Sequence, residues 1–241
     1  MQLPFDPGSR RRIYLLRHAD AAYGAEGGPS DIRLVPLTRL GREQAHGMAR
    51  LLAEATIDRV VCSGLPRTHE TAQIVIGPRE LAIDVVPELE EVRHGTGSAP
   101  TREGTAQGRK FPARDLAYAL WSAKEEGGSF LGGERFSDLW DRVIGAMDPL
   151  IAAADWSGML LVGHGAVNRI ILSWALGADH TSVPHIEQDP CCLNLIDVDV
   201  DPRGNVVRRM VRVLNLTAYD LPKTSQLLTW LELAAQRIRE A

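Results

Sequence analysis

Short apolar runs recur along the chain, and most are followed by a longer segment in which apolar residues recur at helical spacing. A short apolar run bounded by charged or turn residues is typical of a buried strand. This pattern predicts strands at 12–17, 58–62, 81–86 and 158–163, and helices at 38–54, 66–76, 136–154 and from Gly165 to about 176. Alternating strands and helices predict one α/β domain with a mainly parallel central sheet.

The last part of the chain has a different pattern. Two apolar runs at 192–200 and 206–215 are joined by turn residues, which predicts a β-hairpin. An amphipathic helix is predicted at 223–239, with one apolar stripe made of Leu227, Trp230, Leu231, Ala234 and Ile238. We expect this stripe to pack on the domain, and a contact in a homodimer is the alternative. No strong linker divides the chain, so residues 1–241 are expected to form a single domain.

Two segments lack a periodic pattern. Residues 19–37 contain several glycines and prolines and predict a long loop after the first strand, placed to form one wall of a site. Residues 95–135 are expected to be an insertion or lid, with little secondary structure over 95–113 and a helix at about 114–124. Three basic residues lie in this insertion, and we expect them to be solvated rather than to cover an anionic substrate: Arg102, Arg109 and Lys110.

The composition is that of an ordinary globular protein, with 44% apolar and 24% charged residues. A net charge of −4 gives no general reason to bind nucleic acid or an anionic membrane. The cysteines Cys62, Cys191 and Cys192 are odd in number and two are adjacent, so we expect buried free thiols. The N-terminus lacks the apolar core of a secretory signal, and no stretch approaches the roughly 20 apolar residues of a membrane span. These features predict a cytoplasmic protein.

Charged residues follow or flank the ends of three predicted strands. Arg17 and His18 follow the first strand, Arg67 lies in the first turn of the helix after the second, and His164 follows the strand that ends at Gly163. Because the carboxyl ends of parallel strands meet at one edge of a sheet, we expect two arginines and two histidines to converge. Two guanidinium groups suit a phosphate dianion, and an imidazole can act as a nucleophile.

Six motifs surround these residues, in an order that resembles the histidine phosphatase superfamily, also called phosphoglycerate mutase-like. They are Arg17-His18-Ala19; Leu37-Thr38 with Gly41 and Gln44-Ala45; Ser63-Gly64-Leu65-Pro66-Arg67-Thr68 with Thr71-Ala72; Leu89-Glu90-Glu91 followed by Gly95; Gly133-Glu134 with Arg142-Val143; and Leu161-Val162-Gly163-His164-Gly165. Ala19 replaces the glycine of the Arg-His-Gly signature and leaves both chemical groups intact. The resemblance covers residues 13–175 and implies a three-layer α/β/α fold.

The resemblance also implies a role for each residue. His18 would be the nucleophile that becomes phosphohistidine, and Arg17, Arg67 and His164 would form the phosphate pocket. Glu91 would be the proton donor and later the base for water, with the adjacent Glu90 as the competing candidate. The implied activity is hydrolysis of a small phosphorylated molecule with no metal and no other cofactor.

Other residues near the implied site are candidates for contacts with substrate. They are Arg93 and His94 after the acidic pair, and Asp20, Tyr23 and Arg33 in the long first loop. Mutases of the family carry Arg-His-Tyr-Gly after the acidic residue, whereas this chain has Val92-Arg93-His94-Gly95. A phosphatase is therefore favoured over a phosphoglycerate mutase. A catalytically silent module that binds a phosphorylated ligand is the third hypothesis, against which the retained histidines, arginines and glutamate argue.

Overall fold

A six-stranded sheet with the order β3-β2-β6-β1-β7-β8 forms the centre of the computed structural model, which describes residues 10–23, 29, 31–95, 105–106, 109–110, 112–224 and 227–240. The strands are β1 (Arg10–Arg17), β2 (Arg59–Cys62), β3 (Ile83–Val85), β6 (Gly158–Gly163), β7 (Leu193–Val200) and β8 (Val206–Leu216). β1, β2, β3 and β6 pair in parallel, whereas β7 is antiparallel to both β1 and β8. The prediction of a mainly parallel sheet followed by a hairpin is confirmed.

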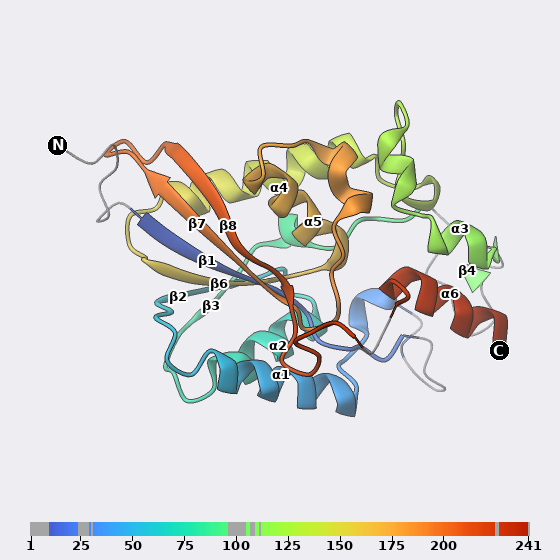
Figure 1. Ribbon diagram of the computed structural model, residues 1–241, viewed down its shortest axis with the longest axis horizontal. Coiled ribbons are helices and arrows are strands. Elements are labelled where there is room, and N and C mark those ends of the chain that lie inside the picture. The colour runs from blue at the N-terminus through green and yellow to red at the C-terminus, as the bar shows by residue number, and fades with distance from the viewer. Residues whose placement is uncertain are drawn as a thin grey trace.

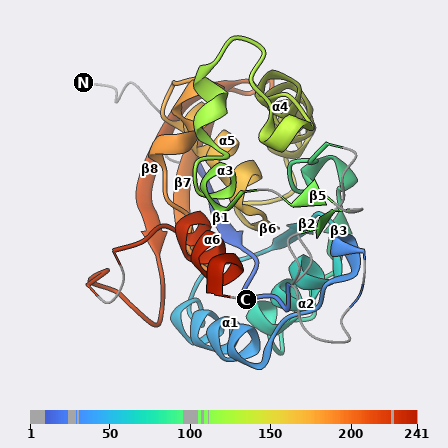
Figure 2. The ribbon, with the colours of Figure 1, turned by 90° about the vertical axis from the view of Figure 1, so that its right-hand side faces the viewer.

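Four helices cover the two faces of the sheet: α1 (Arg39–Leu51), α2 (Pro66–Ile76), α4 (Phe136–Ala152) and α5 (Gly165–Ala175). Because alternate residues of a strand point to opposite faces, the central strand β1 contributes to two cores. Ile13 and Leu15 pack with residues of α4 and α5, while Tyr14 and Leu16 pack with residues of α1 and α2. Figures 1 and 2 show these helix pairs on opposite sides of the sheet, which is a three-layer fold.

The C-terminal helix α6 (Trp230–Glu240) begins later than the pattern predicted. The Thr229 hydroxyl and backbone N–H both donate to the Glu232 carboxylate, at 2.9 and 2.7 Å, and this capping box fixes the start of the helix. Upstream, Lys223 has a positive φ of 56° and its ammonium donates to Asp189, so this part of the segment is not helical. Leu227, placed on the stripe by the pattern, is 95% exposed.

The insertion is more structured than the sequence predicted. It contains a two-stranded antiparallel ribbon of β4 (Thr105–Ala106) and β5 (Arg109–Lys110), followed by α3 (Ala113–Ala117). The helix predicted at 114–124 is broken, because residues 121–124 form a separate 3₁₀ turn. In that turn the Ser122 hydroxyl bonds to the carbonyls of Ala119 and Ser129. The expectations for residues 1–9, for residues 24–28 and 30, for Arg102, and for the side chains of Arg109 and Lys110 concern parts of the chain that the structure does not describe.

α3 packs against α6, and the two helices lie side by side at the end of the molecule toward which β1 runs (Figures 1 and 2). Leu231 of α6 also packs against the hydrophobic core. The expectation that the C-terminal stripe packs on the domain is therefore confirmed for Leu231. All three cysteines are buried and free, as expected. None of the described helices is both long enough and apolar enough to span a membrane.

Two buried aspartates of β7 form ion pairs with arginines of the neighbouring strands β1 and β8. Asp197, which is 2% exposed, accepts from Arg12 of β1 and from Arg212 of β8, both at 2.8 Å. Two residues further along, Asp199 bridges Arg10 and another β8 arginine in the same way. These ion pairs neutralise carboxylates that would otherwise be costly to bury.

Candidate active site

The parallel pairing of β1, β2 and β6 brings three of the motifs to one edge of the sheet. Arg17 at the end of β1 is the register partner of Gly163 at the end of β6, and β2 ends on the other side of β6 at Cys62. His18 and His164 therefore follow neighbouring strands. Their ring centroids are 5.3 Å apart, in an edge-to-face arrangement. The convergence of the two histidine segments was expected from the sequence.

The backbone fixes the tautomer of His18, which is only 2% exposed. Its Nδ1 lies 2.8 Å from the carbonyl oxygen of Ala19. Because a carbonyl oxygen can only accept, Nδ1 carries the proton and the lone pair of the neutral ring is on Nε2. The hydroxyl of Tyr23 lies 3.4 Å from that Nε2. His18 is thus held with an unprotonated nitrogen available for chemistry.

The second motif holds the chain immediately after His18. The Thr38 hydroxyl caps α1 by accepting from the N–H of Gly41 and donates to the carboxylate of Asp20. Gln44 accepts the backbone N–H of Asp20 at 2.9 Å. A Cβ on Gly41 would lie 2.0 Å from the carbonyl oxygen of Asp20, so only glycine permits this close approach. Asp20, a candidate for substrate contact, is therefore used to anchor the loop to α1.

A chain of three hydrogen bonds fixes the second imidazole, His164, which is fully buried. The Thr68 hydroxyl lies 2.8 Å from the carbonyl of Leu65 and must donate to it. Ser63, 3.0 Å from Thr68, must then donate to Thr68, and so Ser63 Oγ accepts from His164 Nε2 at 2.8 Å. The proton of neutral His164 is thereby placed on Nε2. Its Nδ1 is buried and has no hydrogen-bond partner among the described residues.

Two buried arginines flank the histidines. Arg17 is 4% exposed and donates from Nη1 to the Gln188 carbonyl at 2.7 Å, while Arg67 is 3% exposed and donates from Nη1 to the Ile32 carbonyl at 3.0 Å. The Nε of each arginine is buried without a partner among the described residues. Buried donors without partners are rare in folded proteins, and two of them beside two imidazoles indicate a site for an anion.

Burial and the two arginines lower the pKa of both histidines. For His18, loss of solvation lowers the pKa well below its ordinary value, and the positive charges of Arg67 and Arg17 lower it further. The pKa of His164 is lowered by the same loss of solvation, then by Arg67, by His18 and by the charges of Arg17 and Arg142. Both rings are therefore neutral at neutral pH, and a bound dianion would offset part of the positive field.

The two adjacent carboxylates lie in different surroundings. Glu91 Oε1 accepts the N–H of Ala166 at 3.1 Å and that of Val92 at 3.0 Å, so the Glu91 carboxylate caps the N-terminus of α5. Glu90 instead forms an ion pair with Arg33 at 2.7 Å, and the Arg33 side chain is 62% exposed. A Cβ on Gly165 would lie 3.4 Å from Glu91 Oε2 and 3.6 Å from Arg17 Nε, which places Glu91 next to the anion site.

The fifth motif supports the turn that carries the acidic pair. Arg142 of α4 makes a bidentate ion pair with Glu134, with both bonds at 2.8 Å. The same guanidinium donates to the carbonyls of Glu88 and Glu90. Glu134 also accepts the backbone N–H of Arg93 at 3.0 Å. This pair bridges α4 to the segment that ends in Glu91.

Of the remaining predicted contact residues, Tyr23 reaches His18, whereas Arg93 and His94 lie further from the two imidazoles. The side chain of Arg93 is exposed. His94 packs on Phe130 with ring centroids 6.1 Å apart, and burial lowers its pKa although Glu91 raises it. Tyr23 is 39% exposed, with its ring 5.6 Å from the Arg67 guanidinium.

Arg169 and Gln188 are buried beside the site and carried no signal in the sequence analysis. Arg169 of α5 donates to the carbonyls of Ile186 and Gly165 and forms an ion pair with Glu187 at 3.3 Å. Ser63 lies in the motif that contains Arg67, but its bond to His164, 101 residues further along the chain, does not follow from its place in that motif. The Gly165 carbonyl lies one helical turn before Arg169 in α5, whereas the contacts of Arg169 with Ile186 and Glu187 depend on how the 186–188 segment folds.

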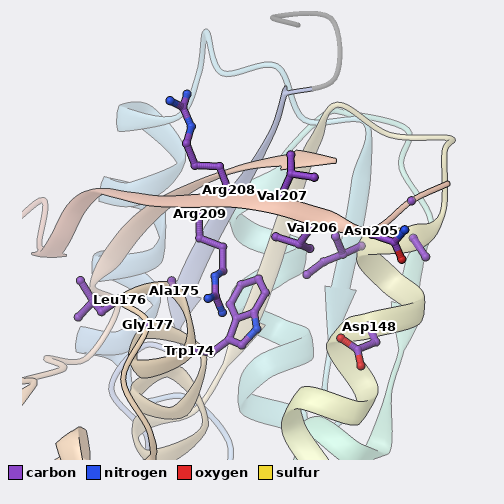
Figure 3. A pocket seen from close by; sticks show the side chains of 13 residues that line it. Asp148, Trp174, Ala175, Leu176, Gly177, Asn205, Val206, Val207, Arg208 and Arg209 are labelled. Carbon is purple, nitrogen blue, oxygen red and sulfur yellow. The ribbon is translucent and has the colours of Figure 1, made fainter. Parts of the chain in front are cut away.

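A cleft with a volume of about 770 Å³ lies elsewhere, between β8 and the ends of α4 and α5 (Figure 3). Trp174 and Arg209 stack there, with the guanidinium 4.8 Å from the ring centroid. The cleft is at the C-terminal end of α5, whereas His164 caps the opposite end. Within the described residues, no three His, Cys, Asp or Glu side chains gather into a group that could hold a metal ion.

A comparison with protein families agrees with this fold and with this site of two histidines and two buried arginines. The model of the histidine phosphatase superfamily (branch 1) matches residues 13–212. The chain belongs to this superfamily, as the motifs had indicated.

Individual relatives carry two kinds of name. The chain is similar to the adenosylcobalamin/alpha-ribazole phosphatase of Salmonella typhimurium, at 29% identity over 188 residues that cover 78% of this chain and 90% of that protein. It is also similar to a protein of Yersinia enterocolitica named as a probable phosphoglycerate mutase, GpmB, at 27% identity, with 79% of this chain and 86% of that protein covered.

Solved structures show the same fold. The alpha-ribazole phosphatase from Shigella flexneri matches with a TM-score of 0.64 at 27% identity, over 85% of this chain and 96% of that chain. A mycobacterial glucosyl-3-phosphoglycerate phosphatase matches with a TM-score of 0.68 at 22% identity, over 86% of this chain and 99% of that chain. The chain is thus a histidine phosphatase superfamily enzyme by family and by fold.

Proposed function

We propose that this chain hydrolyses a small phosphomonoester through a phosphohistidine formed on His18. The observation that carries the proposal is the site at the end of β1, where the unprotonated Nε2 of His18 lies beside two arginine Nε donors that have no partner among the described residues. His18 Nε2 is unprotonated because Nδ1 donates to Ala19. The buried Nε atoms of Arg17 and Arg67 are the donors that a phosphoryl group would satisfy.

The reaction has two steps. In the first, His18 Nε2 attacks phosphorus, the P–N bond forms as the ester P–O bond breaks, and Glu91 gives a proton to the leaving oxygen. In the second, water attacks phosphorus, Glu91 takes a proton from that water, and the P–N bond breaks to release phosphate. Arg17, Arg67 and His164 stabilise the charge on the phosphoryl oxygens throughout both steps.

The position of Glu91 supports its assignment over Glu90. The Glu91 carboxylate lies at the N-terminus of α5, and both its Oε2 and Arg17 Nε lie within 3.6 Å of the position that a Cβ on Gly165 would take. Glu90 is engaged by Arg33 at the surface. Because the arginines supply the positive charge that phosphoryl transfer requires, we propose that the reaction needs no metal ion. The proposed location is the cytoplasm.

The names of the relatives leave two reactions to distinguish. A phosphatase releases orthophosphate from its substrate, whereas a phosphoglycerate mutase moves the phosphoryl group between positions and needs a bisphosphate primer. We favour hydrolysis, because the segment after Glu91 reads Val92-Arg93-His94-Gly95 and the Arg93 side chain is exposed. A catalytically silent binding module would bind orthophosphate but would not produce it from a phosphomonoester.

A direct test uses purified protein and a panel that includes an aryl phosphate, alpha-ribazole phosphate and the phosphoglycerates. We expect orthophosphate release that persists with a chelator present, and no transfer between 2- and 3-phosphoglycerate with a bisphosphate primer. His18→Ala should abolish release, while His46→Ala, which removes an exposed histidine of α1, should not change it. Full hydrolysis by His18→Ala would refute the proposal, and primer-dependent transfer would replace the phosphatase with a mutase.

A further inference from the structure

The C-terminal helix α6 reaches the candidate site although it lies beyond the segment that defines the family. The family model ends at residue 212, and α6 covers residues 230–240. At the first turn of α6, the backbone N–H of Trp230 donates to the Glu187 carboxylate at 3.4 Å. Glu187 in turn pairs with the buried Arg169. The helix is therefore attached to the segment that also holds Arg17.

The indole of Trp230 lies over the guanidinium of Arg17, whose central carbon is 4.9 Å from the ring centroid. Nη1 of the same guanidinium donates to the Gln188 carbonyl at 2.7 Å. The Arg17 side chain is thus held by the Trp230 indole and by the Gln188 carbonyl, and its buried Nε has no partner among the described residues. A Cβ on Gly165 would lie 3.6 Å from this Nε and 3.4 Å from Glu91 Oε2, so the Nε and the Glu91 carboxylate both lie next to Gly165.

We propose that Trp230 is a positioning residue that holds Arg17 ready for the phosphate, which makes α6 part of the phosphate site. The inference rests on the proposed function of that site. An arginine side chain has many rotamers, and fixing it in advance removes an entropy cost from phosphate binding. The indole also attracts the cation through its π face and covers it from water, which strengthens the field of the guanidinium on a bound anion.

A role in positioning predicts a particular kinetic signature. Because Trp230 acts through Arg17, its loss should weaken binding of every phosphorylated ligand by the same factor, whatever the leaving group. If Trp230 instead contacted the leaving group, the effect would differ between substrates and would be absent for orthophosphate. The expected change is a higher KM and a higher inhibition constant for orthophosphate, with little change in kcat.

The test compares Trp230→Leu, which keeps an apolar side chain, with Trp230→Phe, which keeps an aromatic face. We expect Trp230→Leu to weaken orthophosphate binding, measured by calorimetry, by about 2- to 30-fold. Trp230→Phe should recover most of the affinity. Trp174→Leu is the matched control, because it removes a similar stack on Arg209 at the cleft of Figure 3. This control should leave orthophosphate affinity unchanged.

Arg17→Ala separates a failure of this inference from a failure of the proposed function. In the Arg17→Ala background, Trp230→Leu should have no further effect on orthophosphate affinity. If Arg17→Ala weakens binding but a folded Trp230→Leu binds as wild type, or if Trp230→Leu still weakens binding without Arg17, the positioning role is refuted. If Arg17→Ala itself leaves phosphate binding unchanged, the proposed phosphate site is refuted as well.

Discussion

Replacing Ser63 by alanine tests the hydrogen-bond chain that fixes His164. In the wild type, Thr68 donates to Leu65, Ser63 donates to Thr68, and His164 Nε2 donates to Ser63. A neutral His164 therefore has a lone pair on Nδ1, which repels an anion. Binding of a dianion next to Nδ1 would require a proton there, and the resulting imidazolium keeps its Nε2–H bond to Ser63.

The magnitude follows from the charge of the ring in the bound state. A hydrogen bond to a charged group contributes about 1.5–3 kcal/mol, and His164 is fully buried, so water does not replace the lost hydroxyl. We expect Ser63→Ala to lower kcat/KM by about 10- to 150-fold at neutral pH. Ser63→Thr keeps a hydroxyl on the same carbon and should retain most of the activity.

The pH dependence of anion binding separates this role from a general loss of structure. Sulfate is a suitable probe because it stays dianionic throughout the neutral range. Wild-type affinity for sulfate should fall as the pH rises, since His164 must be protonated to bind it. In Ser63→Ala the neutral ring is free to carry its proton on Nδ1, so the dependence should be weaker. Wild-type kcat/KM together with a wild-type pH profile in folded Ser63→Ala would refute the reasoning.

Three further substitutions test the acid and the ion-pair ladder. Glu91→Gln should lower kcat by about 10²- to 10⁴-fold for an alkyl phosphate and less for an aryl phosphate, whereas Glu90→Gln should stay within a few fold of wild type; equal losses would contradict the assignment. Asp197→Asn should lower the free energy of unfolding in urea by about 1–3 kcal/mol at pH 7, because Arg12 and Arg212 lose their shared partner. Burial would raise the pKa of Asp197, but the bonds from Arg12 and Arg212 outweigh it and hold it below its ordinary value. The ion pairs of Asp197 therefore contribute fully to stability above about pH 4, and their contribution is lost as the pH falls through the pKa of Asp197 in the folded protein. The difference in unfolding free energy between wild type and Asp197→Asn should shrink in acid, and a difference that stays constant would contradict this.

The elements and motifs that are local in sequence could be predicted. The apolar run before Arg17 predicted β1, and the run before His164 predicted β6, because a buried strand leaves a direct mark on the sequence. The motif around Thr38 was recognised from its residues alone. Its physical cause is visible only in the structure, where Gly41 allows contact with the carbonyl of Asp20.

The convergence of the histidine segments could be predicted from the strand pattern, but individual side-chain contacts between distant segments could not. The contact of Trp230 with Arg17 joins residues from opposite ends of the chain, and helical periodicity says only that the indole lies on an apolar stripe. The start of α6 was placed too early, although the capping box of Thr229 and Glu232 was readable in the sequence. The bond of Ser63 to His164 requires the parallel pairing of β2 with β6.

Trapping the covalent intermediate tests the central claim most directly. The wild type is mixed with an aryl phosphate, quenched in alkali within the first turnover, digested and analysed by mass spectrometry. The account predicts a phosphoryl group on the peptide that contains His18, labile to acid, and none in His18→Ala. Burst release of the aryl alcohol should match the amount of modified peptide. Steady hydrolysis with no phosphoryl group on His18, or a phosphoryl group on another residue, would contradict the account.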